Sequence, residues 1–207
     1  MQYRIIKTIV DKFTSLILIV FLSPILVIIS FLVFSLDGLP IFFLQERMSK
    51  NGKFKIFKFK TMRNKNFGYQ VTQKNDTRIT KLGTILRQFK LDELPQLFNI
   101  LKGDMSFIGP RPESFYFFKY YPEDYLSFFK DIKPGLFDLY TIQNINESDW
   151  LSLYENPEEV YINYLIPKKY KAARNYKRNI SLIYDLVCIK LYLKLVFNKL
   201  FFNLLRR

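Results

Sequence analysis

The segment "FTSLILIVFLSPILVIISFLVFSL", residues 13–36, carries no charged side chain over its 24 residues. As a continuous helix it would be about 36 Å long, which exceeds the thickness of a bilayer hydrocarbon core, about 30 Å. The apolar run is too long for a cleaved signal peptide, and no A-x-A pattern follows it. The segment therefore predicts a membrane helix, either a full span or a re-entrant hairpin.

Two features favour the hairpin. Ser23 and Pro24 lie near the middle of the segment, where proline removes one backbone hydrogen bond and bends a helix. Each limb would be roughly 16–20 Å long, enough to reach the midplane and return. Basic residues flank the segment on both sides: Arg4, Lys7, Lys12, Arg47, Lys50, Lys53 and Lys55. The positive-inside rule then places both ends on the cytoplasmic side, and a proline-kinked span remains the alternative.

The composition of the whole chain indicates a polyanionic partner. The 207 residues carry a net charge of +14, which suits nucleic acid, anionic lipid or phosphorylated substrates. The 22 Phe and 14 Tyr favour a membrane surface over a nucleic-acid groove. A membrane-anchored nucleic-acid binder stays as a rival class, although the sequence contains no recognisable nucleic-acid motif.

The choice of metal is narrowed by the near absence of nitrogen and sulfur ligands. The chain has no His, and Cys188 is its single cysteine. The usual zinc sites and an intrachain disulfide are therefore excluded. A bound metal would be a hard cation held by carboxylates and phosphates, and we expect Mg²⁺.

The segments that follow residue 40 alternate between strand and helix patterns. Residues 45–62 predict a loop, an Asn51-Gly52 turn and a β-hairpin, whose alternation slips at Ile56-Phe57 and indicates a bulge. Residues 64–80 are polar and predict a mobile loop. Residues 82–89 predict a short helix.

A second helix is predicted from Asp92 to Gly103, because Pro95 is tolerated only in a first turn and glycine ends a helix. The aromatic residues 113–129 predict either a core helix or an interfacial belt. Residues 182–207 predict an amphipathic helix with a polar stripe that includes Lys190 and Lys194. This helix would lie in the headgroup plane or would face the core.

The adjacent acids Asp92 and Glu93 are candidate catalytic residues. A carboxylate at a helix N-terminus is stabilised in its charged form, and the same place attracts phosphate. Such a carboxylate can attack phosphorus if a cation screens the repulsion, and Glu93 could hold that cation. Prolines on both sides of Arg111 fix its backbone, so its guanidinium could fork onto phosphate oxygens. The alternative for the acid pair is a simple helix cap.

The order of these motifs resembles the bacterial sugar transferase family, the monotopic polyprenol-phosphate phosphoglycosyl transferases, of the small type that consists of the catalytic domain. The resemblance runs from about Lys7 to Lys133 and so covers more than half of the chain. "LDELPQL" followed by "GDMS" and "GPRP" at this spacing is its most specific part. The other matching pieces are Lys7, Asp11, Ser23-Pro24, Gln45-x-Arg47, "FKIFKFKTM" and "TRITKLGTILRQFK".

The resemblance implies a mainly helical α+β fold. A re-entrant membrane helix-hairpin would occupy residues 1–40, with its break at Ser23 and Pro24. Residues 41–207 would form a cytoplasmic, membrane-associated catalytic domain with a small β-hairpin, a helical core and a C-terminal interfacial helix. The protein would be monotopic on the cytoplasmic face of the bacterial inner membrane.

The resemblance also implies a reaction. Asp92 would attack the β-phosphate of a UDP-sugar, form a phosphosugar-enzyme and release UMP, and undecaprenyl phosphate would then accept the phosphosugar. Asp92 and Glu93 would hold Mg²⁺. The implied phosphate-binding residues are Arg111 and, less specifically, Lys58, Lys60, Arg78 and Arg87. For these four bases the alternative is a solvated or lipid-facing charge.

This reaction would be the first membrane step in assembling a polysaccharide, O-antigen, capsule or glycoprotein. The implied partners are anionic membrane lipids and downstream glycosyltransferases, without nucleic acid, and a homodimer is left open. The chain departs from the family pattern at Ser49, Asp138 and Thr141, where relatives usually carry Gly, Gly and Gln. The altered region 136–145, which contains Asp138 and Thr141, motivates one further rival, a catalytically impaired relative that acts as a membrane scaffold in glycan assembly.

Overall fold

Helix α1, Gln2–Asp37, is the longest element of the computed structural model, which describes residues 2–49, 52–63, 71, 76–144 and 147–205. One face of α1 packs along the body of the protein. Ser15 and Val33 are buried on this face, and Leu18 and Leu26 pack against buried clusters. Only 11% of the most apolar window of α1 is buried. Packing within the chain therefore does not account for the apolar character of the rest of this helix.

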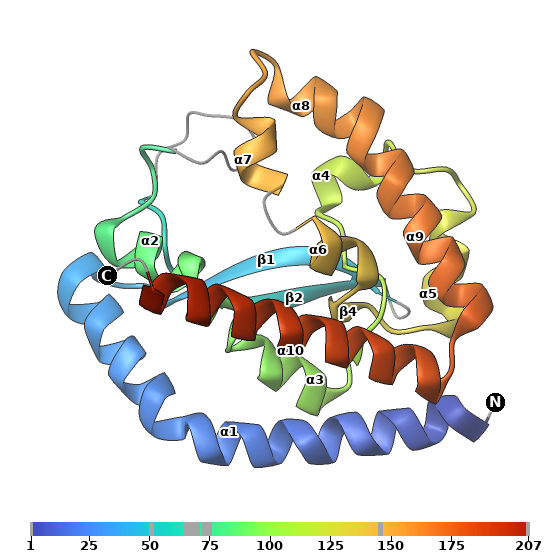
Figure 1. Ribbon diagram of the computed structural model, residues 1–207, viewed down its shortest axis with the longest axis horizontal. Helices are drawn as coiled ribbons and strands as arrows, with labels where there is room; N and C mark the ends of the chain where they lie inside the picture. Colours follow the sequence, from blue (N-terminus) through green and yellow to red (C-terminus); the bar gives the residue numbers. More distant parts are fainter. Residues whose placement is uncertain (1, 50–51, 64–70, 72–75, 145–146, 206–207) are drawn as a thin grey trace.

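Helix α1 is continuous through Ser23 and Pro24, so the predicted break is a bend within one helix, and the re-entrant course of this helix in a membrane stays a prediction. Pro24 lies inside the helix, which bends partway along its length (Figure 1). Pro24 has no N–H to donate to the carbonyl of Val20. The Ser23 hydroxyl donates to that oxygen instead, at 2.8 Å. Because the freed carbonyl keeps a partner, the proline bends the helix without interrupting it.

Strands β1, Phe42–Ser49, and β2, Gly52–Phe59, form the predicted antiparallel hairpin, although β1 begins earlier than predicted. The pairing runs one to one from Phe42↔Phe59 to Ser49↔Gly52, so the predicted bulge is wrong. The sequence slips in phase because both faces of β2 are covered. Ile56 packs into one buried cluster and Phe59 into another. The predicted turn residue Asn51, and residues 64–70 and 72–75 of the predicted loop, lie outside the described residues.

The acid pair lies in a 3₁₀ turn, Leu91–Glu93, between α2, Lys81–Gln88, and α3, Gln96–Lys102. The prediction of α2 is confirmed to within one residue. The prediction that the next α-helix begins near Asp92 is wrong, because Pro95 cannot donate to the carbonyl of Leu91. The N–H of Leu94 bonds that carbonyl instead, at 3.2 Å. Gly103 ends α3 as predicted, with φ of 95°.

Two short parallel strands, β3 (Ser106–Ile108) and β4 (Gly135–Phe137), bring distant segments together. The chain crosses itself closely at Gly109 and Gly135. A Cβ atom on Gly109 would lie 2.5 Å from the carbonyl oxygen of Lys133, and one on Gly135 would lie 2.2 Å from the nitrogen of Gly109. Glycine at both positions therefore allows the crossing from which the Arg111 segment emerges.

The second half of the chain is helical, and its main buried cluster is rich in aromatic residues. Tyr125 and Phe129 are 1% exposed, so core packing explains much of the aromatic segment 113–129, whereas Phe115 on the same segment is exposed. The helices are α4 (Phe115–Phe118), α5 (Tyr125–Asp131), α6 (Leu139–Gln143), α7 (Glu147–Leu151), α8 (Pro157–Val160), the π-helical turn η2 (Tyr161–Leu165), α9 (Ile166–Asn179) and α10 (Leu182–Leu205). The structure is thus a mainly helical α+β fold.

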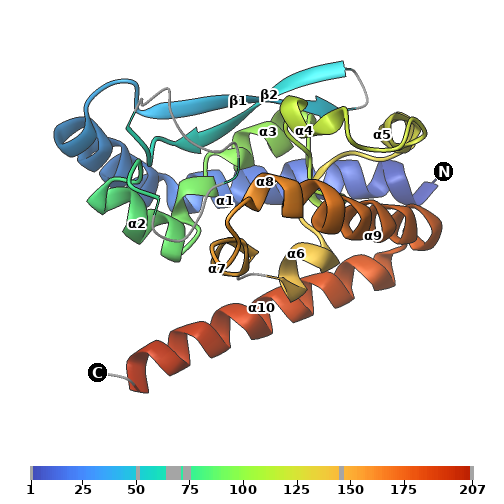
Figure 2. The same cartoon turned by 90° about the horizontal axis from the view of Figure 1, so that it is seen from above.

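Helix α10 lies at the opposite edge of the body from the β-hairpin (Figure 2). Near its start, buried Asp185 accepts hydrogen bonds from Tyr3 and Lys7 of α1 and from Tyr176 of α9. The face that continues from Asp185 packs on the core, whereas Ile183, among other apolar residues of α10, is exposed. The core-facing alternative therefore explains one face of α10, and its place at a membrane interface stays a prediction.

Candidate active site

The acid pair is buried, although both side chains are carboxylates. Asp92 is 7% exposed and Glu93 is 9% exposed. The residue before the turn, Lys90, adopts a left-handed conformation with φ of 58°, which redirects the chain into the 3₁₀ turn. Burial of a carboxylate costs free energy unless cations or hydrogen-bond donors compensate it. The surroundings of the two acids differ strongly in this respect.

Glu93 is held by two cations. Its Oε1 accepts hydrogen bonds from Lys58 Nζ at 2.9 Å and from Arg111 Nη2 at 2.5 Å. Although burial raises the pKa of Glu93, Arg111 and Lys58 outweigh it and hold that pKa well below its usual value. Glu93 therefore stays ionised and acts as a fixed negative charge, not as a proton donor.

Asp92 is less well compensated. Its Oδ1 is buried and has no hydrogen-bond partner among the described residues. Burial raises the pKa of Asp92, and the neighbouring charge of Lys58 opposes this increase. An oxygen without a donor is more basic than one that accepts hydrogen bonds. Asp92 therefore has a buried carboxylate oxygen that no donor of the described residues engages, and this oxygen keeps its capacity to bind a substrate atom or a cation.

Arg111 is positioned by the glycine crossing described above. The carbonyl of Pro110 accepts a hydrogen bond from the N–H of Gly135 at 2.9 Å. The guanidinium donates to the carbonyl of Leu136 at 3.2 Å as well as to Glu93. The charge of Glu93 raises the pKa of Arg111, so the guanidinium stays charged. The motif "GPRP" thus places a fixed cation beside the acid pair.

The remaining predicted bases divide into two groups. Arg87 lies near the acid pair: burial lowers its pKa, the charge of Asp92 raises it, and its Nε donates to Thr61 at 2.9 Å. Lys60 instead donates to the carbonyl of Asp37 at the end of α1, at 2.9 Å. The described contacts of Arg78 include an ion pair with Asp76 at 2.6 Å. The structure therefore brings Lys58, Arg87 and Arg111 to the acid pair, whereas the described contacts of Lys60 and Arg78 are with other groups. The phosphate-binding roles of all five stay predictions.

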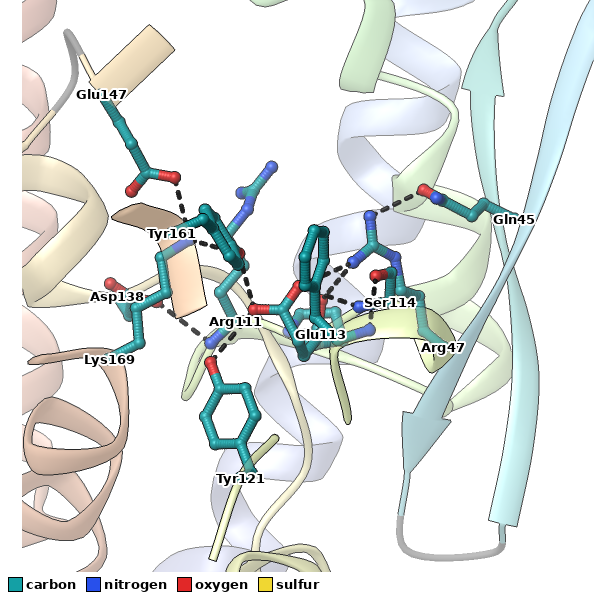
Figure 3. A network of polar contacts seen from close by, with 12 residues as sticks. Gln45, Arg47, Arg111, Glu113, Ser114, Tyr121, Asp138, Glu147, Tyr161 and Lys169 are labelled. Carbon is teal, nitrogen blue, oxygen red and sulfur yellow. Dashed lines mark hydrogen bonds and ion pairs between the residues drawn. The ribbon is translucent and has the colours of Figure 1, made fainter. Parts of the chain in front are cut away.

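Glu113, two residues after Arg111, lies at the centre of a buried network that the sequence analysis missed (Figure 3). The carboxylate of Glu113 accepts hydrogen bonds from Tyr121 at 3.0 Å and from Tyr161 at 2.7 Å. Arg47 also pairs with Glu113 and donates to the carbonyl of Pro112 at 3.1 Å. The signal that could have indicated this role is an acid directly after "PRP" in a strongly basic chain.

The network continues away from Glu113 toward α7. Lys169 Nζ donates to the hydroxyl of Tyr161 at 2.7 Å and to Glu147 at 2.9 Å. Tyr161 opens the π-helical turn η2 and Lys169 follows on α9. Because the network joins β1, the Arg111 loop and three helical segments, it stabilises the wall of the site on the side of Arg111.

Two of the departures from the family pattern interact with each other. Asp138 caps α6, because its Oδ1 accepts a hydrogen bond from the N–H of Thr141 at 2.6 Å. Ser49, the third departure, ends β1 and its hydroxyl lies 3.5 Å from the carbonyl of Asp104. The segment that contains Asp138 and Thr141 is therefore the ordered start of α6.

The acid pair supplies two carboxylates, which is the number of protein ligands that Mg²⁺ usually takes at most. No group of three or more Cys, Asp or Glu side chains gathers within the part of the chain that the structure describes. Mg²⁺ usually takes one or two carboxylates and completes its shell with water and substrate phosphates. The buried oxygen of Asp92 that no described residue engages suits such a site, with Glu93 as the second carboxylate.

The fold and the site define a protein with a long, apolar N-terminal helix and a buried carboxylate pair beside fixed cations. The family model described as "Bacterial sugar transferase" matches residues 2–199. The chain therefore belongs to the bacterial sugar transferase family.

Three curated relatives illustrate the range of names in this family. The chain is 42% identical over 114 residues to the UDP-N-acetylgalactosamine-undecaprenyl-phosphate N-acetylgalactosaminephosphotransferase of Aeromonas hydrophila, which covers 54% of this chain and 27% of that protein. It is 36% identical over 171 residues to the UDP-glucose:undecaprenyl-phosphate glucose-1-phosphate transferase of Klebsiella pneumoniae, covering 78% and 36%. It is 32% identical over 165 residues to the undecaprenyl-phosphate galactose phosphotransferase of Salmonella typhimurium, covering 71% and 34%. The chain thus spans less than two thirds of the length of these relatives.

Proposed function

We propose that the protein is a phosphoglycosyl transferase that moves a sugar-1-phosphate from a UDP-sugar to undecaprenyl phosphate. The observation that carries this proposal is the pairing of Asp92, whose buried Oδ1 has no hydrogen-bond partner among the described residues, with Glu93, which is held between Lys58 and Arg111. One acid is free to react and the other is fixed as a charge. The three relatives are named for this transfer with three different sugars, so the sugar of this chain is left open.

In the first proposed step, Asp92 attacks the β-phosphorus of the UDP-sugar. The bond from that phosphorus to the oxygen bridging the two phosphates breaks, and this oxygen leaves as part of UMP. In the second step, a phosphate oxygen of undecaprenyl phosphate attacks the same phosphorus. The bond to Asp92 then breaks, which returns the carboxylate and gives a polyprenyl diphosphate sugar.

The neighbouring cations have separate roles in this scheme. Arg111, held by Glu93 and Leu136, presents its guanidinium to the phosphate oxygens. Lys58 and Arg87 lower the electrostatic repulsion between the Asp92 carboxylate and the anionic donor. Mg²⁺, which Asp92 and Glu93 would hold, supplies charge neutralisation of the diphosphate when it is bound.

We further propose that the protein is monotopic on the cytoplasmic face of the inner membrane. Near its N-terminus α1 contacts Asp185 of α10, and near its C-terminus Asp37 accepts a hydrogen bond from Thr80 at 2.8 Å. A helix that spans a bilayer has ends about 30 Å apart on opposite sides. Contact of both ends with one folded body supports a bent helix that enters and leaves the same leaflet, with its exposed apolar side chains in the lipid.

The decisive experiment is incubation of the purified protein in nanodiscs with a panel of UDP-sugars, Mg²⁺ and undecaprenyl phosphate. We expect UMP release with at least one sugar. Without the lipid acceptor, UMP release should stop after about one turnover per enzyme, because the phosphosugar stays on the protein. Absence of UMP release with every sugar would favour the impaired scaffold. Binding that depends on nucleic-acid length and salt would favour the nucleic-acid binder.

A further inference from the structure

The carboxylate of Asp138 joins two elements that are distant in sequence. Its Oδ1 accepts the N–H of Thr141 at 2.6 Å, and its Oδ2 accepts the backbone N–H of Arg111 at 3.0 Å. A helix N-cap needs one oxygen for its own helix. The second oxygen is therefore available for the loop that carries the arginine, and both bonds have ordinary geometry.

The segment that contains Asp138 accepts hydrogen bonds from both the backbone and the guanidinium of Arg111. The carbonyl of Leu136 accepts from the guanidinium at 3.2 Å, while Asp138 accepts from the backbone of Arg111. The hydrogen bond between Pro110 and Gly135 fixes the loop one residue earlier. The backbone and the side chain of the arginine are thus set by the same stretch of β4 and the start of α6.

Misplacement of Arg111 would disturb the acid pair as well as a bound phosphate. Its guanidinium is one of the two cations that hold Glu93, at 2.5 Å. A change of about 1 Å in a group that positions substrate can cost a large factor in rate. A glycine at position 138 would offer no side-chain acceptor to the backbone N–H of Arg111.

We propose that Asp138 is a positioning residue for phosphosugar transfer. It fixes the backbone of Arg111, so that the guanidinium meets the donor phosphate beside Asp92. This inference rests on the proposed function. It also gives the departure at Asp138 a role in the reaction, which is the opposite of the scaffold alternative.

The variant that separates the two bonds of Asp138 is Asp138→Ser. Serine keeps a good N-cap for Thr141, but its single, shorter oxygen cannot also reach Arg111. We expect kcat/KM for the UDP-sugar to fall about tenfold, with a melting temperature close to that of the wild type. The amide of Arg111 should also exchange hydrogen faster in this variant. The control is Asn156→Ala, which removes the N-cap of α8 and should lower the melting temperature without changing kcat/KM.

A double-mutant cycle with Arg111→Lys tests whether Asp138 acts through the arginine. If it does, Asp138→Ser should change the activity of the Arg111→Lys enzyme less than about twofold, because the positioned group is already gone. An equal tenfold loss in both backgrounds would overturn the inference. So would a wild-type kcat/KM or an unchanged Arg111 exchange rate in Asp138→Ser. A wild-type protein that transfers no phosphosugar would refute the proposed function itself, and this inference with it.

Discussion

Replacement of Glu113 with Gln should destabilise the protein strongly. Glu113 is 7% exposed, and its carboxylate accepts from Tyr121, Tyr161 and the N–H of Ser114 while it pairs with Arg47. A glutamine amide would keep one acceptor oxygen and turn an NH₂ group toward donors. Removal of one partner from a buried ion pair costs about 3–5 kcal/mol. In a chain of this size, 1 kcal/mol corresponds to about 2–4 °C, so the melting temperature should fall by about 10 °C.

Thermal unfolding in detergent micelles, followed by intrinsic fluorescence, measures this change. The matched control is Glu46→Gln on β1, the strand that also carries Arg47. Glu46 pairs with Lys53 at 3.6 Å, and both side chains are 50% exposed. Exposed pairs contribute at most about 1 kcal/mol, so the control should shift the melting temperature by only a few degrees. Equal shifts for Glu113→Gln and Glu46→Gln would refute the reasoning about the buried network.

The difference in stability between the wild type and Glu113→Gln should depend on pH, and the direction of this dependence follows from the pKa of Glu113. Burial raises the pKa of Glu113, but Lys169 and Arg47 outweigh it and hold that pKa below its usual value. A depressed pKa contributes stability that is fully present above the unfolded value, about 4.3, and is lost as pH falls through the folded pKa. The difference in stability between wild type and Glu113→Gln should therefore be largest near neutral pH and shrink below about pH 4. A constant difference down to pH 3 would contradict this.

Three further perturbations test the site and the membrane helix. Asp92→Asn should abolish the covalent adduct formed from a radiolabelled UDP-sugar and lower the transfer rate by at least about a thousandfold, near 4 kcal/mol. Glu93→Gln should lower the transfer rate less, and the rate should recover partly at high Mg²⁺. An adduct on Asp92→Asn would remove Asp92 from its role. Lys58→Ala should lower UMP release per folded molecule at least about tenfold, because Glu93 loses one of its two cations, while Lys55→Ala, at an exposed position on the same strand, should leave it within about twofold. Pro24→Ala should straighten α1 and so expose a cysteine introduced near the N-terminus to an impermeant thiol reagent in intact cells. Labelling equal to that of the protein with Pro24 would count against the bent, one-sided arrangement.

Much of the candidate site could be predicted because its parts are close in sequence or carried by rigid motifs. Asp92 and Glu93 are adjacent, and the prolines around Arg111 limit its backbone. The sequence could not show that Glu113 lies at the centre of a network, since Tyr161 and Lys169 meet it only through the packing of η2 and α9. The burial of Glu113 is a tertiary property, and no local pattern encodes it.

The errors in the fold predictions have local physical causes. Pro95 was used to place the start of an α-helix, although the same missing N–H produces a 3₁₀ turn before α3. The phase slip at Ile56 and Phe57 was interpreted as a bulge, but a strand covered on both faces loses its alternation without one. At Pro24 the sequence indicates a bend, and the structure has a continuous helix there in which the Ser23 hydroxyl donates to the carbonyl of Val20.

The packing of α1 on α3 has a consequence for how the enzyme would respond to its lipid environment. Leu18 and Leu22 of α1 pack into the cluster that contains Leu97 and Ile100, and α3 begins three residues after Glu93. The turn that carries the acid pair is therefore linked to α1 through the direct packing of α3 on that helix. A displacement of α1 along the membrane normal would carry the carboxylates to a new height above the headgroups. Bilayer thickness would then affect the reaction by changing the height of the acid pair relative to the headgroups, without a lipid contacting the active site.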